Sequence, residues 1–386
     1  MVAPQPFYSP RGTPMNVLQL CRVLTGAGYH VDLLTYPLGR DATMPRLRIH
    51  RAPRIPGIDH VPIGFSWQKL PLDAALCFRA LTLLVRRRYR LVHAVEESAF
   101  LALPLTWLGV PLLYDLDSQI SDQLAYSGAV RSRVLLAGIR TLERLTVRRS
   151  RAVITMCRTS SDWVRSVSPT VPCFQIEDTP LPESQRAPDP QVVAALRERI
   201  GLGDRRAVVY TGNLESYQGI DLLLAAAARL REAVADAVVV VVGGEPEQVE
   251  ALRKRIGVER LEGAVLAVGE RPPHEIPEWM GLADLLVSPR RDGTNTPLKI
   301  YTYMQSGVPI VATDLPTHTQ VLDATTAVLC EPTPEGLAAG IAWALEKRAE
   351  AAGLGKAARE RAERHYGPAA FEEKLLAAYS AVIGPP

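Results

Sequence analysis

The chain has 386 residues, which is long enough for two domains that each bury a hydrophobic core. Its composition is that of an ordinary globular protein, with 47% hydrophobic and 22% charged residues, and no apolar run approaches the ~20 residues of a membrane span. The net charge of +3 combines a basic half, residues 1–178 with 22 Lys and Arg against 13 Asp and Glu, with an acidic half, residues 179–386 with 22 against 28.

The first half of the chain alternates helical stretches with short apolar strands. Helices are expected at 17–26, 74–87, 99–108 and 131–149, and strands at 30–35, 91–94, 111–116 and 152–156. This rhythm predicts a parallel sheet covered on both faces by helices. Ahead of it, the opening Met-Val-Ala-Pro leaves too few apolar residues for a usual first strand. Either the start lies further upstream or the first strand is short.

A second series of strands and helices follows a proline-rich stretch. Six prolines between 169 and 190 predict an interdomain linker. Strands are then expected at 207–210, 238–242, 265–268, 285–288 and 309–312, with helices at 219–234, 246–256 and 276–281. Two Rossmann-like halves predict a ligand cleft between the carboxyl ends of their sheets.

The segment from Ser288 to Thr313 has the pattern of an anion site. Thr296 is a natural N-cap, and Pro297 follows where its missing N–H costs nothing. Gly293 lets the backbone approach a ligand, and Lys299 lies in the first turn of the helix. Free amides at a helix N-terminus favour phosphate. An ordinary helix start is the alternative interpretation.

Four segments, in this order and spacing, resemble glycosyltransferases of the GT-B fold, most of all the retaining family 4 group. They are SPRGTPMNVLQLCRVLTGAGYHV, VVYTGNLESYQGIDLLLAAAARL, ADLLVSPRRDGTNTPLKIYTYMQSGVPIVAT and FEEKLLAAYSAVIG. The resemblance implies an α/β protein with two Rossmann-like domains facing each other across a cleft. Residues 1–175 would form the acceptor-side domain and 176–365 the nucleotide-sugar donor domain, with helix 366–386 packing back toward the first.

The donor site departs from the family pattern. Asn213 and Gln218 stand where the family has Arg and Lys, and Thr294 and Thr302 stand where it has two glutamates. Either the site is rebuilt around the cations Arg290, Arg291 or Lys299, or catalysis is lost; the polar replacements favour rebuilding. The expected donor-binding residues are Gly12, Gly212, Asn213, Gln218, Arg290, Gly293, Thr294, Asn295, Thr296, Lys299 and Thr302.

Two residues of the first half are the expected catalytic groups. Asp117 occupies a position where the family has His, and could bind sugar hydroxyls or act as the acceptor's base. His93 is expected at a strand end, on the acceptor side. Asp115 and Asp117 also match a metal-binding Asp-x-Asp pattern, but the resemblance implies no metal or other cofactor. His318 is expected near the mouth of the cleft. Structural roles are the alternative for each.

The resemblance implies transfer of a hexose from a nucleotide-diphosphate sugar to a glycan or lipid-linked acceptor, with retention, in envelope polysaccharide or glycolipid synthesis. The alternatives are a non-catalytic GT-B subunit beside an active transferase and a GT-B epimerase. The scattered cysteines and the lack of a signal-peptide pattern predict a cytoplasmic protein. The basic half predicts contact with an anionic membrane, at the inner face of the plasma membrane, rather than nucleic acid.

The arginine clusters at 86–88 and 148–149 are the candidate membrane contacts. Both follow helical stretches, so favourable interaction with the helix dipole is a structural alternative.

Overall fold

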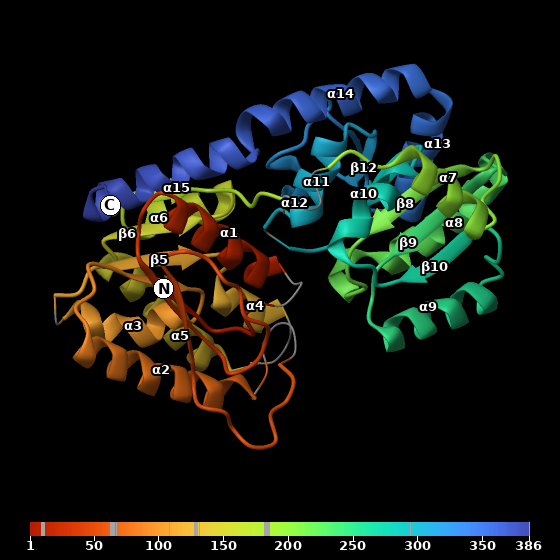
Figure 1. The fold of residues 1–386 in the computed structure, drawn as a ribbon. Coiled ribbons are helices and arrows are strands. Elements are labelled where there is room, and N and C mark those ends of the chain that lie inside the picture. Colours follow the sequence, from red (N-terminus) through yellow and green to blue (C-terminus); the bar gives the residue numbers. More distant parts are fainter. Residues whose placement is uncertain are drawn as a thin grey trace. The chain divides into compact units, whose positions relative to one another are not determined.

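The computed structural model describes residues 1–8, 12–61, 66, 68–107, 109–126, 130, 132–180, 186–293 and 295–385 (Figure 1). The chain divides into two compact units. Unit 1 comprises Met1–Asp178 and Ala369–Pro386, and unit 2 comprises Thr179–Pro368. The α/β architecture expected from the sequence is confirmed in both units, because each contains one wholly parallel sheet with helices on its two faces.

Unit 1 has seven strands among its described residues, in the order β3-β2-β1-β4-β5-β6-β7. The strands are β1 (Val2–Ala3), β2 (Val31–Thr35), β3 (Leu47–Arg51), β4 (Val92–Val95), β5 (Leu112–Leu116), β6 (Ala152–Thr155) and β7 (Cys173–Gln175). The helices are α1 (Gly12–Gly26), α2 (Lys69–Arg86), α3 (Ser98–Thr106), α4 (Ile120–Tyr126), α5 (Arg133–Arg149), α6 (Arg158–Val167) and α15 (Pro368–Ile383). Helices α1 and α15 pack on one face of the sheet, and α3, α5 and α6 pack on the other.

Unit 2 has six strands among its described residues, in the order β10-β9-β8-β11-β12-β13. They are β8 (Arg206–Thr211), β9 (Ala237–Val242), β10 (Val265–Gly269), β11 (Leu285–Ser288), β12 (Ile310–Thr313) and β13 (Val328–Cys330). The α-helices are α7 (Pro190–Arg199), α8 (Ile220–Ala233), α9 (Pro246–Val258), α10 (Ile276–Gly281), α11 (Leu298–Ser306), α12 (Pro316–Thr319), α13 (Pro334–Glu346) and α14 (Arg348–His365). Every residue of β9 is buried, as expected for a parallel strand covered on both faces.

The proline-rich stretch contains the boundary between the two units, which falls after Asp178. It also contains regular structure, because β7 follows Pro172 and Pro190 opens α7, where the Asp189 side chain caps the helix by accepting from the Gln191 N–H at 2.9 Å. One local expectation was wrong. Thr296 does not cap α11. The helix begins at Leu298 after the extended backbone of Pro297, and no side chain bonds to this cap.

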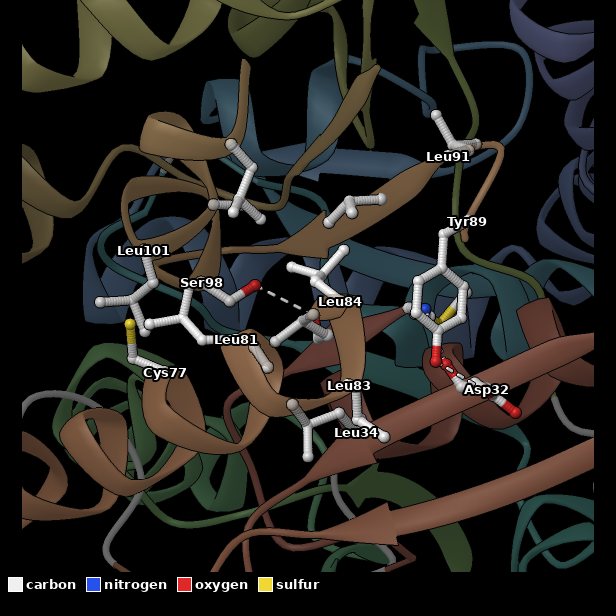
Figure 2. A pocket seen from close by; sticks show the side chains of 16 residues that line it. Asp32, Leu34, Cys77, Leu81, Leu83, Leu84, Tyr89, Leu91, Ser98 and Leu101 are labelled. Carbon is white, nitrogen blue, oxygen red and sulfur yellow. Dashed lines mark hydrogen bonds between the residues drawn. The ribbon is translucent and has the colours of Figure 1, made fainter. Parts of the chain in front are cut away.

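Figure 2 shows an apolar pocket in unit 1, between the sheet and helices α2 and α3. Its oxygen-bearing side chains are already bonded within the protein. Tyr89 donates to the Asp32 carboxylate at 2.7 Å, and Ser98 donates to the Val2 carbonyl at 2.9 Å. The pocket therefore offers little to a phosphate-bearing ligand.

All five cysteines are free thiols. Throughout the described ranges, none of the helices combines the length and hydropathy needed to cross a bilayer.

Two glycines allow neighbouring loops to approach closely at the carboxyl edge of the unit 2 sheet. Gly243, after β9, has φ +126°, and a Cβ there would lie 2.0 Å from the Gly212 carbonyl oxygen in the loop after β8. Gly219, which precedes α8, has φ +76°, and its Cβ would lie 2.0 Å from the Pro289 carbonyl oxygen after β11. Any side chain at either position would push adjacent loops apart.

We predict that Gly243→Ala destabilises the protein more than Gly263→Ala. Both glycines have positive φ, but a Cβ at Gly263 would meet open space. The control should cost about 1–2 kcal/mol through backbone strain alone. Gly243→Ala should cost at least about 1 kcal/mol more, because the Gly212 carbonyl must move. Urea unfolding measures both free energies, and equal losses would contradict the close approach.

Candidate anion site in unit 2 and carboxyl cluster in unit 1

The sheet of unit 2 has a topological switch point between β8 and β11. From this pair the strand order runs outward in opposite directions, to β9 and β10 on one side and to β12 and β13 on the other. The loops that leave these two central strands, 212–219 and 289–297, therefore open at the same edge, where ligands bind in open parallel sheets. The backbone N–H of Arg291 donates to the Tyr217 carbonyl at 3.1 Å and ties the two loops together.

Lys299 carries a buried ammonium group at this point. Its Nζ has no hydrogen-bond partner among the described residues, although part of the side chain remains accessible. The nitrogen lies 3.8 Å from the centroid of the Tyr210 ring, and a Cβ on Gly212 would come within 3.0 Å of it. Burial, and then repulsion by Arg290, lowers the pKa of Lys299 well below its usual value. Among the described residues, Arg290 is the only charged group that acts on it, so no counter-charge is present there.

Arg290 is the second cation, and the protein holds it rigidly. Its guanidinium donates to the carbonyls of Asp292 and Asn295 at 2.7 and 3.2 Å and to the Asn295 side-chain oxygen at 3.2 Å. It also lies over the Tyr217 ring, 5.1 Å from the centroid. The side chain is 6% exposed, and burial lowers its pKa. Gly293 is required beside it, because a Cβ there would lie 2.5 Å from the guanidinium.

His318 positions Arg290 and does not add charge. Its Nδ1–H donates to the Thr313 carbonyl at 2.8 Å, so that Nε2 accepts from the Ser288 hydroxyl, also at 2.8 Å. The Thr313 hydroxyl in turn donates to the Arg290 carbonyl at 2.6 Å. Burial lowers the pKa of His318 to about 3, which keeps the imidazole neutral at physiological pH. His318 is fully buried at the carboxyl edge of the sheet. The expectation that it lies near an open cleft mouth was therefore wrong.

The remaining polar residues expected in the donor site fall into two groups. The Gln218 Oε1 and the Thr296 hydroxyl are buried and lack a partner within the described parts of the chain. The Asn213 Oδ1, by contrast, accepts from the Glu215 N–H at 3.3 Å, and the Thr302 hydroxyl bonds back to the Leu298 carbonyl at 3.5 Å. The first two can serve a ligand without losing a bond. Thr294 lies outside the described residues.

The start of α11 adds a third attractive element to the two cations. No side-chain cap is present, and the helix runs for nine residues from Leu298. Its first amides and the positive end of the helix dipole therefore favour an anion beside the lysine. Lys299, Arg290 and this helix start together form an arrangement that can hold phosphate, and we name it the cation pair site.

The residues expected in catalysis lie in unit 1. Asp117 follows β5, is buried, and accepts a hydrogen bond from Thr13. His93 lies inside β4 and not at its end, so the expected strand boundary was wrong. Its Nδ1 lies 2.7 Å from the Tyr379 hydroxyl and its Nε2 lies 3.1 Å from the Asp115 carboxylate. Both ring nitrogens are therefore occupied, and His93 links the sheet to α15.

Gly12 opens α1 in unit 1, where a Cβ would meet open space. The chain does not need a glycine there for packing. No group of three or more His, Cys, Asp or Glu in the described ranges is arranged to hold a metal ion.

Sequence reasoning missed the aromatic and hydroxyl groups that hold the cations. Tyr210 and Tyr217 provide the ring faces under Lys299 and Arg290. Ser288 and Thr313 orient His318. The only sequence signal was their position at or just beyond strand ends, at the edge that binds ligands in this class of sheet.

Two family descriptions match the chain, one in each unit. The Glycosyl transferase 4-like domain matches residues 11–172, and the Glycosyl transferases group 1 domain matches residues 205–347. Together they cover most of the sequence and include the cation pair site.

Two curated relatives match parts of the chain. A GDP-mannose-dependent alpha-(1-6)-phosphatidylinositol monomannoside mannosyltransferase of Mycolicibacterium smegmatis is 36% identical over 134 residues, which are 33% of this chain and 34% of that protein. The alpha-D-kanosaminyltransferase of Streptomyces kanamyceticus is 29% identical over 235 residues, which are 59% of this chain and 60% of that protein. The chain thus spans between about a third and three fifths of these relatives' lengths.

Solved structures share the whole fold. The sucrose-phosphate synthase of Thermosynechococcus elongatus superposes with a TM-score of 0.76 at 22% identity, covering 98% of this chain and 95% of that one. Likeness at this level of identity establishes the GT-B fold.

We predict that Lys299→Met makes the ligand-free protein more stable at pH 7, because it removes a buried ammonium without a counter-charge. The direction in which stability changes with pH follows from the lowered pKa of Lys299. Between the folded value and the unfolded value of about 10.4, the unfolded chain binds the extra proton, so the stability of the native sequence rises with pH.

The advantage of the variant should therefore shrink between pH 7 and pH 10 in thermal unfolding. The exposed Lys356→Met is the matched control and should show neither effect. A constant difference across this range would mean that Lys299 titrates normally.

Proposed function

The chain belongs to the GT-B glycosyltransferases with family 4-like and group 1 domains, and from this premise we propose that it moves a hexose from a nucleoside-diphosphate sugar to a glycan or lipid-linked acceptor. The relative that is named as GDP-mannose-dependent, with a phosphatidylinositol mannoside as its acceptor, supports both halves of this proposal. Retention of configuration and a role in envelope polysaccharide or glycolipid synthesis are proposed from the resemblance to family 4.

The observation that carries the proposal is the buried, unpartnered ammonium of Lys299. Removing a cation from water without a counter-charge costs several kcal/mol, and a fold retains such a group where a ligand supplies the missing charge. A diphosphate fits, because it can bridge the ammonium, the guanidinium side of the site and the amides at the start of α11.

In this mechanism the cation pair site stabilises the leaving diphosphate. Charge develops on the diphosphate as the sugar bond breaks, and a cation already stripped of water responds without reorganising solvent. Arg290 is held in place by Asn295 and Tyr217, and His318 remains neutral and fixes the backbone beside it. These fixed charges take the roles of the family's Arg and Lys, whose positions hold Asn213 and Gln218. The proposed transfer needs no metal ion.

The alternative function is a non-catalytic subunit that binds a nucleotide sugar or only keeps its fold. This alternative arises because Asn213, Gln218 and Thr302 are neutral at positions that are charged in the family. A scaffold without ligand would have no reason to keep Lys299 unpaired, so nucleotide binding separates the two functions.

We further propose that unit 1 contacts an anionic membrane through α2. Exposed apolar residues recur along one face of this helix at helical spacing: Leu70, Ala74, Phe78, Leu81 and Val85. Phe78 is 64% exposed and Val85 is 87% exposed. Arg86 and Arg88 follow them and are also exposed, so apolar and basic groups adjoin as in helices that bind membrane surfaces. Arg87 is instead paired with Asp32 at 2.6 Å.

We predict that the protein binds a nucleoside diphosphate in calorimetry against UDP, GDP and ADP. Lys299→Met should lose at least about tenfold in affinity, because a charge-assisted contact to phosphate is removed. Lys356→Met, an exposed lysine of α14, should bind as the native protein does.

Protonation gives this experiment a second readout. The diphosphate raises the lowered pKa of Lys299, so binding should take up a proton and weaken as pH rises. Buffers of different ionisation enthalpy measure the uptake, which Lys299→Met should reduce. Folded protein that binds none of the three nucleotides would rule out the enzyme.

We predict salt-sensitive binding to vesicles of phosphatidylcholine with phosphatidylglycerol, and weak binding to phosphatidylcholine alone. The Phe78→Ser, Val85→Ser double variant should lose at least about fivefold in affinity, because two apolar side chains no longer enter the bilayer surface. Arg86→Gln with Arg88→Gln should reduce the dependence on salt.

The matched control changes two exposed valines of unit 2, Val192 and Val258, to Ser. An equal loss in that variant would show that α2 is not the contact.

A further inference from the structure

Tyr303 fills a gap between the two central strands of the unit 2 sheet. Strand β8 pairs with β11 at Val208 and Val209, and the pairing ends there. Each strand continues beyond this point, but β8 then pairs only with β9, and β11 only with β12. No strand of the described chain therefore pairs with Thr211, the last residue of β8, on the side of β11. The two strands separate at the topological switch point.

The backbone of Thr211 bonds instead to the Tyr303 hydroxyl. Alternate residues of a strand direct their N–H and C=O groups toward the same neighbour. The Ala207 carbonyl accepts from the Asp284 N–H, just ahead of β11, at 2.9 Å, so Thr211 faces this side too. The Thr211 N–H donates to the Tyr303 hydroxyl at 2.7 Å, and that hydroxyl donates to the Thr211 carbonyl at 3.4 Å. One phenol thus makes both bonds that a strand would have made.

The bond between Tyr303 and Thr211 is enclosed in the core. Tyr303 is completely buried, and burial raises its pKa to about 12, so the side chain remains a neutral phenol. The Thr211 hydroxyl donates to the same oxygen at 3.2 Å. A buried backbone N–H without a partner is costly, so the end of β8 is tied to α11 through this oxygen.

Tyr303 and Lys299 lie on the same face of α11. They are four residues apart in the helix, so their side chains leave it in the same direction. Both contact the end of β8, because Tyr303 bonds to Thr211 and the Lys299 Nζ lies 3.8 Å from the centroid of the Tyr210 ring. The bond of Tyr303 therefore sets the spacing between α11 and β8 within which the ammonium lies.

Tyr210 fixes the backbone on the other side of the lysine. Its hydroxyl donates to the Asn213 carbonyl at 2.6 Å. Gly212 lies between the two tied residues, and a Cβ there would come within 3.0 Å of the Lys299 Nζ and 3.2 Å of the Tyr210 hydroxyl. Two buried hydroxyls thus hold the chain before and after the glycine that Lys299 touches.

We propose that Tyr303 is a positioning residue of the transferase, whose hydroxyl bridges the gap between β8 and β11 and keeps Lys299 aligned for the donor diphosphate. The inference rests on the proposed function, because that function gives Lys299 its ligand. Tyr210 supports the same alignment from the far side of Gly212. Both tyrosines act through the lysine. A tyrosine that only completed the hydrogen bonding of the core would stabilise the fold without changing what Lys299 binds.

The first test is Tyr303→Phe, which removes the hydroxyl and keeps the ring. Because the backbone at 211–213 is no longer held, the diphosphate meets a misaligned cation. Calorimetry should show a loss of at least about tenfold in affinity for the nucleotide of the UDP, GDP and ADP panel that binds best. The matched control is Tyr301→Phe, a second buried tyrosine of α11, whose ring packs on Tyr366 with centroids 5.2 Å apart. This control should bind as the native protein does.

Proton uptake separates positioning from a loss of stability. The titratable groups around Lys299 are Arg290, which is charged, and the neutral His318, Tyr210 and Tyr303. Burial lowers the pKa of Lys299, so nucleotide binding takes up a proton in the native protein. In Tyr303→Phe water should reach the ammonium and raise its pKa, which reduces the uptake by at least about half. Native affinity or native uptake in this variant would overturn the inference.

Tyr210→Phe is a second variant that tests the alignment from the other side. It keeps the ring against Lys299 and removes only the bond to the Asn213 carbonyl. Affinity for the same nucleotide should fall by at least about threefold, because one of the two ties remains. If Tyr303→Phe does not fold, native affinity together with native proton uptake in Tyr210→Phe would overturn the inference.

Unfolding measurements keep this inference separate from the proposed function. If the folded native protein binds none of the three nucleotides, the proposed function is wrong, and the alignment of Lys299 is read from stability alone. Native stability should rise from pH 7 to pH 10, because the unfolded chain binds a proton that folded Lys299 lacks. The rise should be smaller in Tyr303→Phe, where the pKa of Lys299 is closer to its usual value. An equal rise would overturn the inference.

Discussion

A lysine ammonium that lacks a counter-charge is the constraint around which unit 2 is arranged at its ligand edge. Lys299 Nζ lies against the Tyr210 ring, and the space it occupies exists because Gly212 has no side chain. An aromatic face compensates a cation only in part. The backbone of Gly243 in turn packs against that of Gly212. The loops after β8, β9 and β11 are therefore packed around one buried charge. In the proposed function, a diphosphate from outside the chain supplies the missing charge.

Local charge and net charge have opposite signs in the two halves of this protein. The basic first half carries the buried Asp115 and Asp117 at the end of β5, and the acidic second half carries the cation pair site. The reason is that counts are dominated by exposed side chains, such as Arg86 and Arg88 on α2, whereas topology selects the few groups at a sheet edge. The net charge of each half therefore indicates which surfaces that half contacts. It does not indicate which ligand the site in that half binds.

The sequence predicted the fold well where burial leaves a strong pattern. The run 238–242 was recognised because a parallel strand covered on both faces is apolar throughout. The edge strands β3 and β7 were not predicted, because they are short, half-exposed and partly polar. Helix α7 is not predicted from the sequence, because its prolines are typical of linkers, although Pro190 occupies a first helical position.

The candidate site was predictable only for residues within one segment. Arg290 and Lys299 lie nine positions apart and could be recognised together. Tyr210, Ser288 and the roles of His318 and His93 depend on contacts between distant elements, which no local pattern encodes. The prediction that Thr296 caps the helix was wrong, because its hydroxyl is buried next to the extended Pro297 and does not bond to the helix.

Unit 1 is discontinuous in the chain, and this affects how the protein is made. Its core includes Phe371, Leu375, Ala378 and Tyr379 from α15, which leave the ribosome after all of unit 2. During synthesis the face of the sheet that includes His93 is covered by α1 but not yet by α15, while unit 2 can already fold. Helix α15 thus completes the first unit, and the core of unit 1 can close only after all of unit 2 has been synthesised.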